Sequence, residues 1–286
     1  MTEPTSRTFV SQGLTLHYLD WGNAGAPLLI FIHGTSDHAR SWDWTARALK
    51  DRFHVIALDL RGHGDSQWSP DGAYLLAYHV IDLVELIDTL GEQRVTIVGH
   101  SFGGSLASRY AGLYPDRIHK LVVVDGFGPS AESYAKWAQF GAVPRAREWI
   151  DKRRDVKRKT TRRLASLEDA AARMSAGNPR LSQTQARHLA EHGVRRHPDG
   201  YAWKTDPRVS QFTSEDFAVE ITTFWREITA PTLLLRGADS WTHDPEATGQ
   251  AAHLRDRRSV AIAKAGHWPH HDQFETFLRN LQDYLN

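Results

Sequence analysis

The chain has 286 residues, and its 35 Lys and Arg residues nearly balance its 34 Asp and Glu residues, so a nucleic acid or an anionic membrane is not expected as a partner. It contains no cysteine, which excludes disulfides, thiolate metal ligands and a cysteine nucleophile. No apolar run approaches the roughly 20 residues that span a bilayer, so no membrane association is expected either.

Short apolar runs alternate with helical patterns along most of the chain, which is typical of parallel strands covered by crossover helices. The N-terminal stretch predicts a hairpin that turns near Gln12-Gly13 and forms an antiparallel edge. Further strands are predicted, in chain order, at residues 28–32, 54–58, 95–98, 121–124, 232–235 and 260–263. Helices are predicted at residues 42–49, 102–114 and 274–285, and the last of these has apolar residues on one face.

This alternation stops between Gly126 and about Ile228, where a polar stretch with helical character follows. We therefore predict an α/β core made of residues 1–126 and 229–286, with a helical cap inserted at residues 127–228. A basic run at residues 152–163 lies in the cap. Acidic and apolar residues interrupt it, which favours a solvated helix face over a polyanion site.

The segment Gly99-His100-Ser101-Phe102-Gly103 lies directly between a predicted strand and a predicted helix. In that context a G-x-S-x-G motif indicates a nucleophile exposed on a sharp strand-to-helix turn. The glycines suit the turn because side chains there would collide with the neighbouring backbone. We predict Ser101 as the nucleophile, rather than a serine that only caps the helix.

A serine hydroxyl needs a histidine within hydrogen-bond reach to remove its proton. Of the 16 histidines, His267 follows the last predicted strand and precedes the last helix. We predict it as the base, with a histidine merely packed in a loop as the alternative. His270 and His271 stand nearby, at the start of the predicted helix, and are expected on the surface or at a pocket rim.

The third member of such a site is a carboxylate that orients the imidazole and stabilises its protonated form. Two aspartates follow predicted strands at suitable places. Asp239 comes after the strand at 232–235, and Asp125 comes directly after the strand at 121–124. We favour Asp239 and keep Asp125 as the alternative acid.

Acyl transfer also requires backbone N–H groups directed at the developing oxyanion. One is expected from Phe102, directly after the nucleophile, and the other from Thr35 in the turn His33-Gly34-Thr35. Trp241 and Trp268 stand beside the predicted acid and base, and we predict that they line the substrate pocket.

With these motifs in place, the chain resembles the α/β-hydrolase superfamily. Four blocks carry the resemblance: His33-Gly34-Thr35, the loop from Asp59 to Ser66, the Gly99 to Gly104 turn, and Asp239 with Gly266-His267. It implies a mostly parallel, eight-stranded sheet flanked by helices. It also implies that Asp59 and Arg61 are structural. Epoxide hydrolases and haloalkane dehalogenases resemble this core but carry aspartate where this chain has Ser101, which argues against both activities.

The resemblance implies a carboxylesterase-like serine hydrolase that cleaves a small-molecule ester through an acyl-enzyme, with no cofactor or metal. One alternative is hydrolysis of a carbon–carbon bond in a vinylogous diketone by the same triad. A second alternative, from another class, is a non-catalytic ligand receptor or scaffold. The N-terminal stretch lacks the apolar segment of a signal peptide, so a cytoplasmic location is expected. The oligomeric state and the natural substrate are left open.

Overall fold

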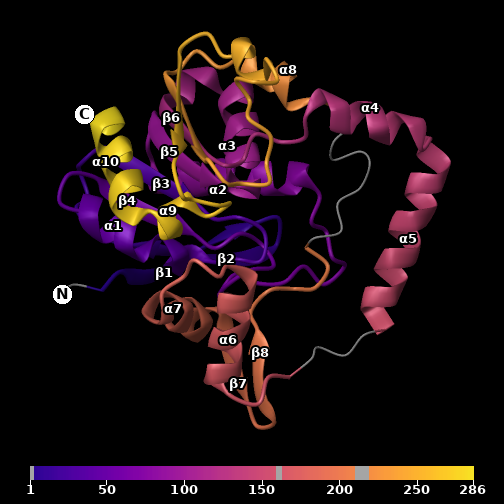
Figure 1. Cartoon of the computed structure of the whole chain (residues 1–286). Coiled ribbons are helices and arrows are strands. Elements are labelled where there is room, and N and C mark those ends of the chain that lie inside the picture. Colours follow the sequence, from indigo (N-terminus) through magenta and orange to yellow (C-terminus); the bar gives the residue numbers. More distant parts are fainter. Residues whose placement is uncertain (1–2, 159–162, 210–218) are drawn as a thin grey trace.

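The computed structural model describes residues 3–158, 163–209 and 219–286, and within them eight strands form one sheet in the order β1-β2-β4-β3-β5-β6-β9-β10 (Figure 1). β1 and β2 run antiparallel to their neighbours, and β4, β3, β5, β6, β9 and β10 pair in parallel. The predicted fold class is confirmed. The strands are β1 (Thr5–Ser11), β2 (Leu14–Asp20), β3 (Leu28–Ile32), β4 (His54–Leu58), β5 (Val95–His100), β6 (Ile118–Val124), β9 (Thr232–Gly237) and β10 (Arg257–Ile262).

The hairpin at the antiparallel edge turns at Gln12 and Gly13, as predicted, and both residues have positive φ. This backbone geometry matches the right-handed twist of the flanking strands. At the centre of the sheet, all five residues of β3 are buried. Its unbroken apolar sequence therefore reflects a strand that helices cover on both faces.

Helices α1 (Asp43–Leu49) and α10 (Phe274–Leu285) pack on one face of the sheet, where Trp42 and Phe277 are buried with Phe31. Helices α2 (Leu76–Leu90) and α3 (Phe102–Leu113) cover the other face, around Leu83, Leu106 and Ile97. The two helix layers are visible on opposite sides of the strands in Figure 1. Helices thus cover both faces of the sheet with apolar side chains, so a polar site is expected at an edge of the sheet.

The stretch predicted as the cap consists of helices and a small hairpin. Its elements are α4 (Ala131–Gln139), α5 (Ala142–Arg158), α6 (Leu167–Gly177), α7 (Gln183–Gly193), β7 (Val194–His197), β8 (Gly200–Trp203) and α8 (Ile221–Trp225). A small apolar cluster that includes Leu164, Ala170 and Ala190 joins α6 and α7. At the end of the stretch, Ile221 and Trp225 of α8 are buried in the same cluster as Leu106 of α3. The division into core and cap at residues 127 and 228 stays a prediction.

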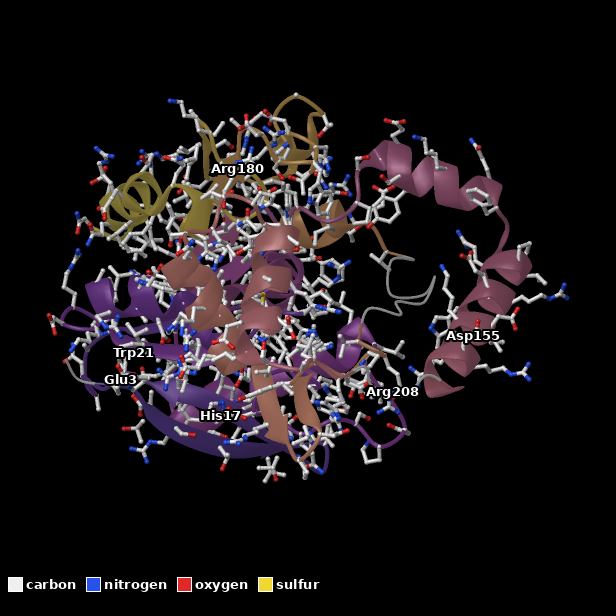
Figure 2. All side chains as sticks on the ribbon, turned by 60° about the horizontal axis from the view of Figure 1, so that its bottom comes forward. Glu3, His17, Trp21, Asp155, Arg180 and Arg208 are labelled. Atoms are coloured by element: carbon white, nitrogen blue, oxygen red, sulfur yellow. The ribbon has the colours of Figure 1, made fainter. Side chains whose placement is uncertain are left out.

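Two residues of the basic run, Lys152 and Arg153, make contacts in the structure. Arg153 donates hydrogen bonds to the carbonyl oxygens of Asp71 and Gly72, at 2.6 and 2.8 Å. Lys152 pairs with Glu148 one helical turn away, and residues 159–162 of the run lie outside the described residues. Figure 2 shows α5, with Asp155 labelled, on the outer side of the molecule. In the described part of the chain, no helix is long and apolar enough to cross a bilayer.

Candidate active site

Ser101 occupies the sharp turn between β5 and α3. Its φ of 52° and ψ of −118° lie outside the regions that L-residues normally adopt, which costs about 1–3 kcal/mol unless the surroundings enforce it. Two glycines enforce it here. A Cβ on Gly99 would lie 2.3 Å from the carbonyl oxygen of Gly103, and a Cβ on Gly103 would lie 2.5 Å from that of Ile32. The hydroxyl-bearing residue is therefore held at the carboxyl edge of the sheet.

His267 lies in the loop between β10 and the short helix α9 (Pro269–Asp272). Its Nε2 atom is 2.9 Å from the Ser101 Oγ atom, within hydrogen-bond distance. His100, the residue before the serine, donates from its Nε2 atom to the His267 carbonyl oxygen at 2.7 Å. The backbone of the histidine is thus fixed by the same turn that presents the serine.

Asp125 is the carboxylate next to the other side of the His267 ring. Its Oδ1 atom lies 3.7 Å from the His267 Nδ1 atom, and its side chain is completely buried. Three donors from the turn after β9 hold this carboxylate: the Gly237 amide at 3.1 Å, the Ser240 hydroxyl at 3.0 Å and the Thr242 hydroxyl. The His267 ring therefore lies between the Ser101 hydroxyl and the Asp125 carboxylate.

Asp239, the acid favoured from the sequence, has a different position. Its side chain is 50% exposed and forms an ion pair with Arg180 at 3.2 Å. Figure 2 shows Arg180 where the cap approaches the C-terminal part of the chain. The structure thus brings the alternative, Asp125, to His267 and directs Asp239 toward the cap. Both follow strands, but Asp125 has a positive φ of 50°, which turns the chain at the end of β6.

The two residues predicted to stabilise an oxyanion flank the serine. Phe102 is the first residue of α3, directly after Ser101. The turn with Thr35 passes over the same place, because a Cβ on Gly34 would lie 3.1 Å from the Ser101 Cβ atom. Among the described residues the Thr35 amide donates no hydrogen bond. This donor is therefore available beside the serine.

Two neutral histidines hold the turn that contains Thr35. The His33 Nε2 atom accepts a hydrogen bond from the Leu60 amide at 3.0 Å, and the His63 Nε2 atom accepts one from the Ser36 amide at 3.1 Å. Burial lowers the pKa of His33 to about 3 and that of His63 to about 4. Both rings can therefore act as acceptors at neutral pH. The sequence analysis did not find this role, because it depends on contacts between two separate loops.

The remaining residues of the loop from Asp59 to Ser66 support the same turn. The buried Asp59 carboxylate accepts hydrogen bonds from the amides of Ala39 and Asp65, at 2.7 and 3.0 Å, and contacts the His17 ring. These contacts hold the pKa of Asp59 well below its usual value although burial opposes them. Arg61 pairs with the buried Asp82. Both residues make the structural contacts that the resemblance implies for them.

Trp241 and Trp268, predicted to line the pocket, both contact the His267 ring, with centroids 4.6 and 5.1 Å away. Trp241 is 78% exposed, so it faces solvent beside the site. The expectation for His270 and His271 was wrong: both are buried, at 2% and 5% exposure, because α9 turns inward after His267.

Comparison with known proteins agrees with this geometry. A family described as "alpha/beta hydrolase fold" matches residues 27–274. The chain is 29% identical over 278 residues to the sn-1-specific diacylglycerol lipase ABHD11 of Mus musculus. This match covers 95% of this chain and 85% of that protein. It is 36% identical over 119 residues to epoxide hydrolase 4 of Mus musculus, but that match spans 41% of this chain and only 33% of the relative.

Among solved structures, the thioesterase domain from the curacin biosynthetic pathway has a TM-score of 0.86 at 22% identity, covering 98% of this chain and all of that one. At this identity the similarity concerns the fold. The match covers 98% of the chain, so it is not confined to the sheet. The catalytic roles of single residues rest on the contacts described above.

Proposed function

Because the chain belongs to the family with the alpha/beta hydrolase fold, we propose that it is a serine hydrolase that cleaves carboxylic esters of small molecules. The observation that carries the proposal is the 2.9 Å contact between the Ser101 Oγ and His267 Nε2 atoms. A serine hydroxyl is a weak nucleophile until a base accepts its proton. Here the nucleophile and the base are already within proton-transfer distance.

In the proposed reaction, Ser101 attacks the ester carbonyl while His267 takes the hydroxyl proton. The imidazolium then returns this proton to the leaving alcohol, and an acyl group remains on the serine. Water, activated by the same imidazole, releases the acid and restores the hydroxyl. The His267 ring accepts and returns every proton in this sequence, so the reaction requires no further acid or base.

We assign the third role to Asp125. A buried carboxylate beside the Nδ1 atom fixes the tautomer that leaves Nε2 free to accept the serine proton, and it stabilises the imidazolium that forms. At 3.7 Å the two atoms are too far apart for a hydrogen bond in the free protein, and catalytic contacts of this kind are often long before substrate binds. Asp239 is half exposed and paired with a cation of the cap, so it is poorly placed for this role.

The amides of Thr35 and Phe102 are proposed to donate to the oxyanion of the tetrahedral intermediate. Both belong to backbone that is held rigidly, one by the two neutral histidines and the other by the helix that begins at it. Donors that need no rearrangement are the ones that stabilise a transition state most. The mouse relative is named as a diacylglycerol lipase, and a lipase also hydrolyses esters.

A panel of p-nitrophenyl esters of increasing acyl length tests the proposal. We expect turnover of at least one ester by the wild-type chain and labelling of Ser101 by a fluorophosphonate. The matched control is Ser259→Ala, which removes an exposed serine of β10 outside the site and should leave turnover and labelling intact. Absence of both turnover and labelling would contradict the proposal and favour a non-catalytic ligand-binding protein.

A further inference from the structure

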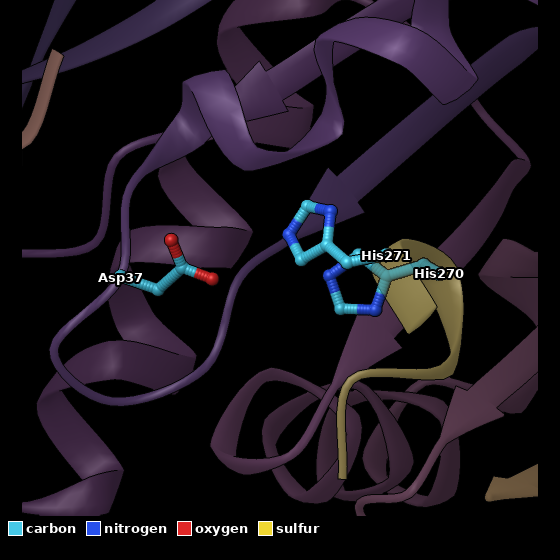
Figure 3. A group of neighbouring side chains, drawn as sticks. All are labelled: Asp37, His270 and His271. Carbon is cyan, nitrogen blue, oxygen red and sulfur yellow. The ribbon is translucent and has the colours of Figure 1, made fainter. Parts of the chain in front are cut away.

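A cluster of three metal-ligating side chains lies behind the catalytic histidine and has no part in the proposed reaction. It consists of Asp37, His270 and His271, and one ligand atom of each lies within 4.8 Å of the others. Figure 3 shows the carboxylate of Asp37 facing the two rings, which come from α9. The cluster therefore joins two segments that are distant in the sequence, the turn after β3 and the segment after His267.

The two imidazoles have unsatisfied ring nitrogens. Both nitrogens of His270 and both of His271 are buried without a hydrogen-bond partner in the structure. A neutral imidazole ring carries one nitrogen lone pair that can bind a metal ion. Buried polar atoms are normally paired, which makes four such atoms in adjacent residues exceptional.

Two other groups of histidine and carboxylate side chains occur in the described residues, and each contains a histidine that already contacts a carboxylate. In the group with Asp59, the His17 Nδ1 atom contacts Asp59 at 2.7 Å and its Nε2 atom contacts Ser6, also at 2.7 Å. In the group with Asp43, the His188 Nε2 atom lies 3.2 Å from the carboxylate. Of these three groups in the described residues, the one with Asp37 contains two buried histidines whose four ring nitrogens all lack hydrogen-bond partners.

We propose that Asp37, His270 and His271 bind one divalent transition-metal ion, with zinc as the best match. Two neutral imidazoles and a carboxylate are the donors that zinc prefers where thiolates are absent, whereas calcium and magnesium select oxygen ligands. Ligand atoms around tetrahedral zinc lie about 3.3 Å apart, so the three atoms need to approach by at most about 1.5 Å. Rotation of the Asp37 and His271 side chains would have to supply this movement, because His270 is stacked on Trp42.

The proposed ion is structural rather than catalytic, so it is independent of the hydrolytic mechanism. His270 stacks on Trp42 with centroids 4.6 Å apart, which fixes the orientation of its ring. Asp37 belongs to a tight turn in which its amide bonds to the Gly34 carbonyl oxygen at 3.3 Å. An ion shared by these residues would tie the Thr35 turn to the segment that carries His267, and would stabilise their relative position.

Zinc binding by the tag-free, EDTA-treated full chain tests the proposal, with calorimetric titration and the zinc content after dialysis as measurements. We expect one ion per chain and a rise of several degrees in Tm with zinc. Asp37→Asn keeps the size of the side chain, and His271→Asn replaces the ring with a smaller polar amide. Each should weaken binding by at least about 100-fold, the upper end of what the loss of an outer-shell partner costs. The Tm of each metal-free variant shows whether its fold is intact.

Two matched controls separate this site from other histidines. His188→Asn removes a ligand of the neighbouring Asp43 group, and His119→Asn removes an exposed histidine on β6. Both variants should bind zinc as the wild type does. Wild-type affinity in Asp37→Asn and His271→Asn, loss of binding in His188→Asn, or absence of binding by the wild-type chain would each overturn the proposal. Because no readout depends on turnover, these outcomes are distinct from failure of the esterase assay.

Discussion

The turn after β6 and the turn after β9 each place an aspartate behind a buried strand, yet the two carboxylates have different surroundings. Asp125 is buried, accepts three hydrogen bonds and lies beside His267. Asp239 is half exposed and pairs with Arg180 of the cap. The two turns cooperate, because the donors that hold Asp125 come from the turn that carries Asp239.

This difference shows that a position after a strand does not by itself define a triad acid. Asp125 has a positive φ at the end of β6, and only 1% of the residue is exposed to water. Electrostatic interactions are stronger there than at the surface. A carboxylate in such a place can orient an imidazole, whereas an exposed ion pair contributes little.

The largest expected effect is the loss of kcat in Ser101→Ala, and variants of the two turns are compared with it. Ser101→Ala removes the nucleophile and should lower kcat for the best p-nitrophenyl ester by about 10⁶-fold, as the loss of a triad serine does elsewhere. Rates for variants of either aspartate should lie above this baseline. A residual rate within 10-fold of wild type would show that hydrolysis occurs at another site.

The buried histidines that hold the Thr35 turn predict that the free energy of unfolding falls in acid. His33 and His63 are neutral in the fold, with pKa values of about 3 and 4, but in the unfolded chain they take up protons below pH 6.5. Their stabilising effect is complete above pH 6.5 and is lost as pH falls toward 4. Each ring contributes about 1.4 kcal/mol per pH unit, so these two rings together should account for about 5 kcal/mol of the stability lost in urea unfolding between pH 6.5 and 4.5.

His63→Gln provides the control for this dependence, because glutamine can still accept the Ser36 amide but does not titrate. The loss of stability between pH 6.5 and 4.5 should then be about 2.5 kcal/mol smaller than in the wild type, because one buried ring no longer titrates. An unchanged dependence in the variant, or a free energy of unfolding that is constant over this range, would contradict the assignment of these rings as neutral acceptors.

A smaller effect is expected from the donors that join the two turns. Thr242→Val removes one hydrogen bond to the Asp125 carboxylate and keeps the shape of the side chain. Such a bond to a charged group contributes about 1.5 kcal/mol, so kcat should fall about 10-fold. Thr248→Val, whose hydroxyl bonds to the Asp244 carbonyl oxygen outside the site, should keep wild-type kcat. Equal rates for the two variants would argue against a role for the Asp125 environment.

The smallest effect is expected where Asp239 meets the cap. Arg180→Gln breaks an ion pair whose partners are 44% and 50% exposed. Exposed pairs contribute about 0–1 kcal/mol, so kcat/KM should change by less than about 5-fold. A loss of several orders of magnitude would restore Asp239 as a candidate for the triad acid.

Much of the fold could be predicted because apolar runs define buried strands directly. The strands at residues 28–32 and 54–58 match β3 and β4 residue for residue, and the helix at 274–285 matches α10. The hairpin of β7 and β8 was not predicted, since its strands are short and half exposed. Helix α2 was also missed, although Val80, Leu83 and Ile87 recur with helical spacing.

The site could be predicted only as far as its motifs are local. Ser101 lies in a five-residue pattern, and the position of His267 near the end of the chain distinguishes it from other histidines. The choice between Asp125 and Asp239 depends on a backbone angle and on the direction of one loop, which spacing in the sequence does not encode. For the same reason, the inward turn of α9 that buries His270 and His271 was not foreseen.

The most direct test of the account compares Asp125→Asn with Asp239→Asn on the same ester, at saturating substrate and pH 7.5. Asparagine keeps the shape of either side chain but cannot stabilise the imidazolium. The account predicts that kcat falls about 10⁴-fold for Asp125→Asn and by less than about 3-fold for Asp239→Asn. The reverse order, or equal losses in the two variants, would contradict it.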